Sequence, residues 1–246
     1  MQPDRLDNAT ARRLFLHRHA LGTVPTGTLT RAGLAALIET LGFVQVDSIN
    51  TVARAHDMIL AARSTAYRPQ QLKKLAERDR AVFEHWTHDA AFIPVAFFPH
   101  WMHRFQREAD RLRERWRRWQ GEAGFAETAR VLAHVRERGP IRARDLSGEA
   151  KRPSGGWWDW HPSKVALEFL WRTGDLAVTR REGFQKVYDL TERVIPAEHR
   201  EASESEPAMI DWACRAALDR LGFASSGELA AFWALVTPAE AAAWCD

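Results

Sequence analysis

The chain is poor in cysteine and has no long run of apolar residues. Among its 246 residues only Cys214 and Cys245 are cysteines, and their spacing matches neither a CxxC pair nor a zinc site, so free thiols in a reducing compartment are expected. The N-terminal residues lack the apolar segment of a secretory signal, and no run approaches the roughly eighteen apolar residues of a membrane span. We therefore expect a cytoplasmic protein with no membrane partner.

Several motifs of cofactor-dependent enzymes are also missing. The sequence has no GxxxxGKS/T loop, no GxGxxG after a strand and no GxSxG elbow, which argues against nucleotide-dependent and serine-hydrolase chemistry. His85 and His88 have i,i+3 spacing, but no second cluster of ligands matches them, so ordinary polar contacts are favoured over a metal. No metal and no cofactor are expected.

The composition is that of a globular protein with a slight basic excess. Hydrophobic residues make up 46% of the chain and charged residues 27%, while the net charge is +3 and the pI is 9.1. Because this net charge is small, the local placement of arginine says more about nucleic acid than the total does. The 11 tryptophans fit either packing in a large core or stacking on bases.

Two polar side chains stand out in the apolar run from Leu41 to Ile49, which predicts a short strand. Side chains alternate between the faces of a strand, so Gln45 and Asp47 point to the same side, whereas on a helix they would lie about 200° apart. A carboxylate beside an amide on a rigid element can activate one water and stabilise a developing positive charge. The alternative is structural: Asp47 caps a turn with Ser48, and Gln45 is a satisfied buried amide.

Residues 1–120 predict a first winged-helix unit, because two helices precede the strand that holds Gln45. Asn8 and Thr30 are the expected N-caps of these helices. A strand over 81–86 is expected to pair with the first one. The helices expected in this unit cover 8–20, 31–41, 54–62, 69–78 and 94–119.

The long helix 94–119 carries an apolar stripe and a neighbouring arginine stripe. The apolar residues are Trp101, Phe105, Leu112, Trp116 and Trp119, and the arginines are Arg104, Arg107, Arg111, Arg115 and Arg118. Acidic residues between the arginines dilute their charge. The arginine stripe therefore fits either a solvated face with i,i+4 ion pairs or a surface that follows DNA phosphates.

Residues 121–200 predict a second winged helix, which begins after a linker at 121–124 and ends in a basic hairpin. Helices are expected over 126–138, 142–146 and 162–173. Arg180, Arg181 and Lys186 lie near the hairpin tip and are candidate DNA contacts. The tryptophan-rich insertion 151–161 fits either stacking beside nucleic acid or docking in a domain interface.

Residues 201–246 predict the start of a third, incomplete winged-helix unit. Helices are expected over 208–221, 227–235 and from 237 onward, with a cap near Ser226. Because no hairpin follows, the apolar side chains Phe232, Trp233, Leu235 and Trp244 are expected to lack part of their partner surface. The fold class is thus mainly α with short β hairpins (α+β), built from tandem winged helix-turn-helix units.

A single carboxylate suits one reaction on DNA. A purine base alkylated at N7 is cationic and leaves without a general acid, and the sugar passes through an oxocarbenium-like state. Asp47 would stabilise that charge and take a proton from the attacking water, while Gln45 fixes the water.

The sequence resembles the AlkZ/YcaQ-like DNA glycosylases along nearly its whole length. The matching segments are 41–50, 54–56, 83–94 with the W-x-H-x-A pattern of Trp86, His88 and Ala90, 138–140, 155–158, 164–168, 174–178 and 187–190. Gln45-Val46-Asp47 matches the Gln-aliphatic-Asp branch of the family, which releases N7-alkylguanines and unhooks interstrand crosslinks.

This resemblance implies a monofunctional, metal-free glycosylase with winged helices around a DNA channel. It places the catalytic roles on Gln45 and Asp47, and makes Arg54, His56, Trp86 and His88 candidates for shaping the site. Double-stranded DNA with alkylated bases is the implied partner, and a monomer associated with the nucleoid is expected. Family members continue beyond residue 246, so activity of a short form is an open point.

Two other interpretations stay open. One is a DNA-binding protein or regulator without catalysis, which a buried Asp47 tied to the backbone would favour. The other is a truncated, inactive family member, which exposed apolar surface over 208–246 would favour.

Overall fold

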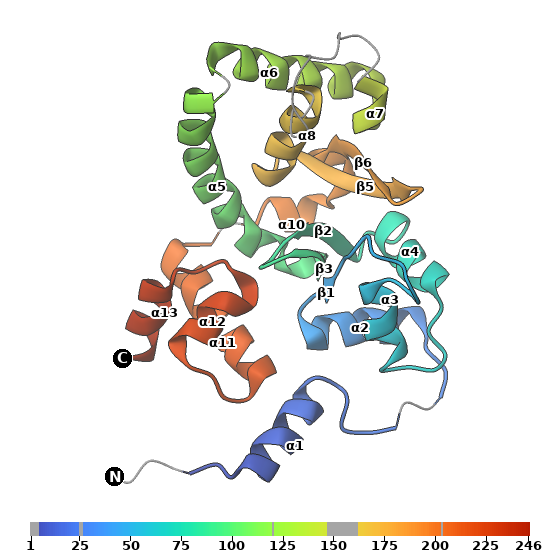
Figure 1. Ribbon diagram of the computed structural model, residues 1–246, viewed down its shortest axis with the longest axis vertical. Helices are drawn as coiled ribbons and strands as arrows, with labels where there is room; N and C mark the ends of the chain where they lie inside the picture. Colours follow the sequence, from blue (N-terminus) through green and yellow to red (C-terminus); the bar gives the residue numbers. More distant parts are fainter. Residues whose placement is uncertain (1–4, 25–26, 120, 147–161, 203) are drawn as a thin grey trace. The chain divides into compact units, whose positions relative to one another are not determined.

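The computed structural model describes residues 5–24, 27–119, 121–146, 162–202 and 204–246. The insertion 151–161 therefore lies outside the described residues. Figure 1 shows a mainly helical chain with two small antiparallel sheets, so the α+β class is confirmed. In the described ranges, no helix is long and apolar enough to cross a membrane.

Helices dominate the chain. The helices are α1 (Asn8–Arg18), α2 (Arg31–Leu41), α3 (Ala55–Ala61), α4 (Pro69–Glu77), the 3-10 helix η1 (Val95–Phe97), α5 (Phe98–Trp119), α6 (Gly121–Arg138), α7 (Ala143–Leu146), α8 (Pro162–Arg172), α9 (Thr191–Val194), α10 (Ala197–Arg200), α11 (Glu206–Leu221), α12 (Ser226–Trp233) and α13 (Pro238–Cys245). The strands are β1 (Val44–Gln45), β2 (Val82–Trp86), β3 (Ala90–Pro94), β4 (Ile141–Arg142), β5 (Leu176–Glu182) and β6 (Gln185–Leu190).

The chain forms two compact units. The first unit comprises Met1–Val82, Trp86–Pro94 and Ser203–Asp246, and the second comprises Phe83–His85 and Val95–Ala202. The expected boundary between 200 and 201 lies close to the point at which the chain re-enters the first unit. The division into winged-helix domains at 120 and 200 stays a prediction. Each compact unit combines segments that are separated in sequence, so the units do not test boundaries drawn along the chain.

The core of the first unit explains why α2 and β1 lie where they do. Leu34 and Ile38 are one turn apart on α2 and are buried against Val44 of β1, Leu60 of α3 and Leu75 of α4. The Thr30 hydroxyl accepts the N–H of Gly33 and begins α2. This packing fixes β1, and with it the position of Gln45.

Gly42 ends α2 as expected, and it also makes a close approach that the sequence does not reveal. Its φ is +89°, in the region that favours glycine. A Cβ at this position would lie 2.5 Å from the Trp233 ring and 2.7 Å from Arg220 Nε. The helices at the end of the chain therefore pack directly on the segment that leads into β1.

The first sheet has the order β1-β3-β2, so the expected direct pairing of the first two strands is wrong. Val44 pairs with Phe92 and Gln45 with Ala91 in antiparallel register. The strand β3 lies between because only residues 87–89 separate it from β2, and so short a turn joins neighbouring antiparallel strands. Pro94 ends this strand instead of beginning the long helix, which starts at Phe98.

The second unit places its sheet in the order β4-β6-β5. The expected hairpin is confirmed, with Arg181 opposite Lys186 and Glu182 opposite Gln185. The expected linker at 121–124 is wrong, because these residues belong to α6. A glycine lowers helix stability by about 1 kcal/mol without preventing a helix, so Gly121 and Gly124 alone do not make a linker.

Two of the four apolar residues expected to lack partner surface, Trp233 and Leu235, are buried, whereas Phe232 and Trp244 are half-buried. Trp233 is fully buried, its Nε1 donates to the carbonyl of Ala213 at 3.1 Å, and Leu235 is buried as well. Phe232 lies 5.3 Å from the ring of Phe43 in an edge contact. For Trp233 the expectation is wrong because Phe43 and Gly42, which lie between α2 and β1, supply part of its surface.

One expected helix cap is wrong by one residue, and another is confirmed. Asp7, not Asn8, accepts the N–H of Thr10 at the start of α1. The cap expected near Ser226 is Ser225, which forms a capping box with Glu228 at the start of α12. Trp101, Trp171 and Trp233 are completely buried, which fits the packing interpretation, whereas Trp86, Trp212 and Trp244 are half-buried.

Candidate active site

Gln45 and Asp47 lie on the same side of an extended segment. Val44 and Val46 are buried, whereas Gln45 and Asp47 are half-buried, which is the alternation of a strand with one face in the core. The regular strand is only Val44–Gln45, shorter than expected, but the N–H of Val46 still donates to the carbonyl of Ala90 at 2.7 Å. The extended geometry therefore reaches the residue before Asp47.

Asp47 uses one of its two carboxylate oxygens within the fold. Its Oδ1 accepts the N–H of Ile49 at 2.9 Å, the geometry of an Asx turn. Among the described residues, no donor lies on Oδ2. Asp47 therefore does cap the turn. Its other oxygen, Oδ2, stays available for catalysis on a half-exposed side chain.

Gln45 is held by a residue outside the expected site. Its Nε2 donates to Asp89 Oδ2 at 2.8 Å, and Asp89 Oδ1 accepts the N–H of Ala90 at 2.8 Å. The register that pairs Gln45 with Ala91, continued by two residues, places Asp47 opposite Asp89. A sequence signal existed, because Asp89 lies inside the W-x-H-x-A segment, but only the strand register brings it to Gln45.

The neighbouring candidates lie at different places around this segment. His56, in α3, is buried with its ring against Phe92, which shares a face with Val44 rather than with Gln45. Arg54 precedes α3 at its N-terminus. The structure thus places His56 on the Val44 side of the strand and Arg54 at the start of α3.

Trp86 and His88 flank the turn between β2 and β3. Trp86 is half-buried at the end of β2, and His88 is exposed one residue before Asp89. The His88 ring lies 5.4 Å from Phe43, which itself lies 5.8 Å from Trp233. His88 therefore joins an aromatic cluster next to the Asp89 turn.

The basic residues of the hairpin in the second unit are largely engaged within the fold. Arg181 makes a bidentate ion pair with Glu84, at 2.6 and 2.8 Å, and the Glu84 side chain is only 1% exposed. Lys186 Nζ lies 3.2 Å from the centre of the Trp171 ring, and burial lowers the pKa of Lys186. Arg180 pairs with Glu182 and is 41% exposed. Of the three side chains, that of Arg180 is the most exposed.

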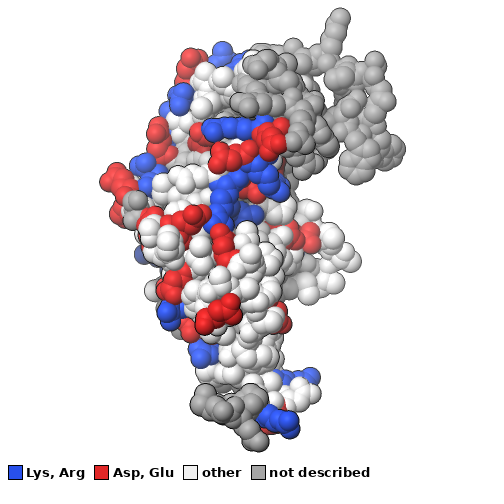
Figure 2. All heavy atoms as spheres, turned by 90° about the vertical axis from the view of Figure 1, so that its left-hand side faces the viewer, with Lys and Arg blue, Asp and Glu red and all other residues white. Residues whose placement is uncertain are grey.

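The arginine stripe of α5 is not a continuous basic surface over its described part. Burial lowers the pKa of Arg104 to about 10, and Arg111 Nη2 donates to both carboxylate oxygens of Glu108, at 2.8 and 2.9 Å. The side chains of Arg115 and Arg118 lie outside the described ones. Figure 2 shows the same mixture, with basic and acidic side chains interspersed on the face in view. For its described arginines, the ion-paired interpretation fits better.

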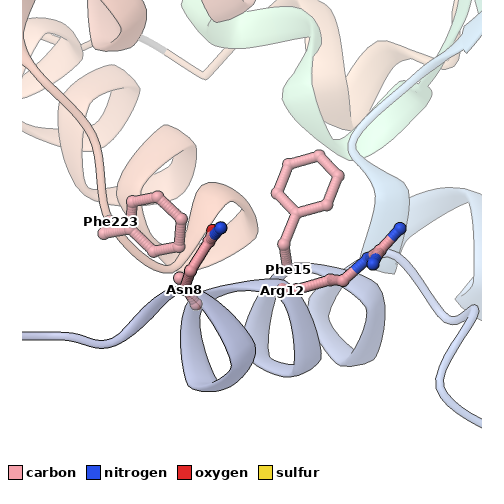
Figure 3. A pocket seen from close by; sticks show the side chains of 5 residues that line it. Asn8, Arg12, Phe15 and Phe223 are labelled. Carbon is pink, nitrogen blue, oxygen red and sulfur yellow. The ribbon is translucent and has the colours of Figure 1, made fainter.

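One shallow pocket lies away from Gln45 and Asp47. Figure 3 shows Asn8 beside Phe223 and Phe15 rising from α1. Ala11 and Arg12 complete the lining of this pocket, whose volume is about 290 Å³. Phe15 and Phe223 are 41% and 47% exposed. This lining carries no carboxylate. Within the described chain, no group of three His, Cys, Asp or Glu residues has metal-binding geometry.

The fold and the site together define a mixed α/β protein whose candidate catalytic pair is an amide and a carboxylate on one strand. A family model described as "DNA glycosylase AlkZ-like" matches residues 38–246, and the chain belongs to this AlkZ-like family of DNA glycosylases. Among solved structures, it is similar to the Streptomyces sahachiroi DNA glycosylase AlkZ, with 14% identity and a TM-score of 0.64. The match covers 95% of this chain and 64% of that one, so the chain spans less than two thirds of that protein.

Proposed function

We propose that the chain is a DNA repair glycosylase that hydrolyses the N-glycosidic bond of N7-alkylated purines. The observation that carries this proposal is the pair Gln45 and Asp47, half-exposed on one side of a strand fixed in the core. Membership of the AlkZ-like glycosylase family supports the reaction class. The specific lesion follows from chemistry, since a site with one free carboxylate oxygen suits a base that leaves unaided.

In this reaction, the bond between the anomeric carbon and N9 of the purine breaks, and its electron pair neutralises the cationic base. The sugar then carries positive charge, which the Asp47 carboxylate stabilises. A water attacks the anomeric carbon and passes a proton to Asp47, while Gln45 orients that water. The products are a free N7-alkylpurine and an abasic sugar.

The second unit supports DNA binding by a winged helix. Its elements follow the order α6, β4, α7, α8, β5, β6, and the sheet order β4-β6-β5 places the first short strand beside the hairpin. In winged helices that bind DNA, the third helix enters the major groove and the hairpin contacts phosphate. Here α8 would be the recognition helix, and Arg180 is the wing residue with the most exposed side chain.

The proposal also includes DNA lesions that are bulkier than a single alkylated base. A half-exposed Asp47, rather than one at the bottom of a deep pocket, suits lesions that do not enter a closed cavity. We therefore include N7-linked interstrand crosslinks among the substrates. The proposed partner is duplex DNA, bound by a monomer of this protein at the nucleoid.

The second candidate function is a DNA-binding protein without catalysis. The hydrogen bond from the Ile49 N–H to Asp47 and the one from Gln45 to Asp89 favour it, because both side chains also serve the fold. Asp47 keeps one oxygen free of protein donors in the described chain, and for this reason we place the glycosylase first.

The test is base release from duplex DNA that contains N7-methylguanine, with wild type and Asp47→Asn compared at equal concentration. Release by the wild type and its loss in Asp47→Asn would support the glycosylase. Asp79→Asn is the matched control, because Asp79 is also a carboxylate of intermediate burial in the first unit but pairs with Arg31 and Arg78. No release by any variant, together with tight binding to the same duplex, would favour the non-catalytic function.

A further inference from the structure

Gln45 has a defined amide orientation, and Asp89 imposes it. The Nε2 of Gln45 lies 2.8 Å from Asp89 Oδ2. A carboxylate only accepts hydrogen bonds, so the nitrogen of the Gln45 amide must face Asp89. The opposite orientation would bring two oxygens together. The Oε1 of Gln45 therefore points away from Asp89, and no donor of the described chain occupies it.

Asp89 is itself held firmly. Its Oδ1 accepts the N–H of Ala90 at 2.8 Å, which fixes the carboxylate against the start of β3. Its carbonyl accepts both the N–H of Thr87, at 2.8 Å, and the Thr87 hydroxyl, at 3.1 Å. A carboxylate tied at both its side chain and its backbone cannot rotate to follow Gln45, so Gln45 adapts to Asp89.

We propose that Asp89 is a positioning residue that orients the Gln45 amide toward the attacking water, an inference that rests on the proposed glycosylase function. With Oε1 directed away from Asp89, Gln45 offers that water an acceptor. Asp47 Oδ2 offers a second acceptor from the same side of the strand. A water that donates both of its protons in this way keeps a lone pair for the anomeric carbon.

The opposite amide orientation would work against the reaction. A Gln45 that presents Nε2 donates a hydrogen bond to the water and engages the lone pair needed for attack. A free amide would adopt the two orientations about equally. Asp89 therefore selects the one that directs Oε1 toward the water. Its contribution acts through Gln45, and this distinguishes it from a direct effect of its own negative charge on the cationic sugar.

The first arm of the test does not depend on activity. In a chain labelled with ¹⁵N at glutamine, the side-chain NH₂ signals of Gln45 are assigned by their loss in Gln45→Ala. We expect two widely separated proton shifts in the wild type, and their collapse toward those of free glutamine in Asp89→Ala. Wild-type signals that already match free glutamine would overturn the proposal, even for a chain that releases no base.

The second arm is a double-mutant cycle on single-turnover base release. We expect Asp89→Ala to slow release about tenfold with duplex affinity unchanged, and to have no further effect in a Gln45→Ala background, because coupled residues are non-additive. An equal loss in both backgrounds would assign Asp89 a direct or purely structural role. Asp79→Ala is the control carboxylate and should leave the rate unchanged.

A third variant separates orientation from loss of the turn. In Asp89→Asn the side-chain oxygen still accepts the N–H of Ala90, so the nitrogen faces Gln45 and turns its amide around. We expect a rate loss like that of Asp89→Ala with the same melting temperature as the wild type. Wild-type rates for Asp89→Asn would overturn the proposal, whereas absence of release by the wild type would refute only the glycosylase.

Discussion

The backbone N–H of Ile49 donates to Asp47 Oδ1 at 2.9 Å, so the candidate catalytic carboxylate also shapes the turn that follows it. One oxygen stabilises the fold, and the other has no donor in the described chain. A substitution that keeps the first interaction and removes the charge can therefore separate the two roles.

Asp47→Asn is that substitution. Asparagine retains an oxygen for the Ile49 N–H, so the turn should persist, while the negative charge that stabilises the transition state is lost. We expect single-turnover base release to fall more than tenfold while duplex affinity changes less than about twofold. Single-turnover kinetics and fluorescence anisotropy on the same duplex provide the two measurements. A parallel fall in rate and affinity would instead assign Asp47 to DNA binding.

Arg181 and Arg180 are neighbours in sequence with different structural roles. Arg181 neutralises Glu84, whose side chain is only 1% exposed, whereas Arg180 pairs with Glu182 at the surface. Removing one partner of a buried pair leaves an uncompensated charge, so we expect Arg181→Ala to cost about 3 kcal/mol of unfolding free energy. Arg180→Ala should change it by less than about 0.5 kcal/mol. Urea denaturation of both variants tests this, and equal midpoints would contradict the buried pair.

Arg180 is also the hairpin residue with which to test the wing. If the hairpin contacts phosphate, Arg180→Ala should reduce the slope of log affinity against log salt by about one, because one fewer counterion is released. Affinity for the same duplex is measured at several salt concentrations. Arg144→Ala is a suitable control, as Arg144 is an exposed arginine of the second unit on α7. An unchanged slope for Arg180→Ala would remove the wing from the interface.

Local signals made much of the fold predictable. The helix from Arg31 to Leu41 has an apolar face, a threonine cap and a glycine end, and the structure reproduces all three. The hairpin of β5 and β6 was equally clear, because alternating residues flank a Glu-Gly turn. In these places the residues that form an element are consecutive, so their own pattern is sufficient.

Long-range packing was not predictable in the same way. The order of the first sheet depends on β3, whose Pro94 resembled a helix start, and burial of Trp233 depends on Phe43 and Gly42, far away in sequence. In the candidate site, too, local features were predictable and long-range ones were not. Gln45 and Asp47 follow from strand alternation, whereas Asp89 emerges only from the register that sets it beside Gln45.

Gly42 gives a direct test of that long-range packing. Alanine at this position would have to accept a φ of +89° and would also place its Cβ 2.5 Å from the Trp233 ring. Gly139 shares the positive φ, at +84°, but a Cβ there would meet nothing within 4 Å, so Gly139→Ala measures the backbone cost alone. We expect Gly139→Ala to cost about 1 kcal/mol and Gly42→Ala to cost about 1–3 kcal/mol more, because Trp233 must move.

Urea denaturation followed by tryptophan fluorescence measures both variants. The comparison is informative because the Trp233 ring that Gly42 contacts is fully buried, and its Nε1 is already committed to the carbonyl of Ala213. The ring cannot shift without losing that hydrogen bond, so the cost of Gly42→Ala includes more than steric overlap. Equal costs for the two variants would mean that the end of the chain does not pack on the segment leading into β1.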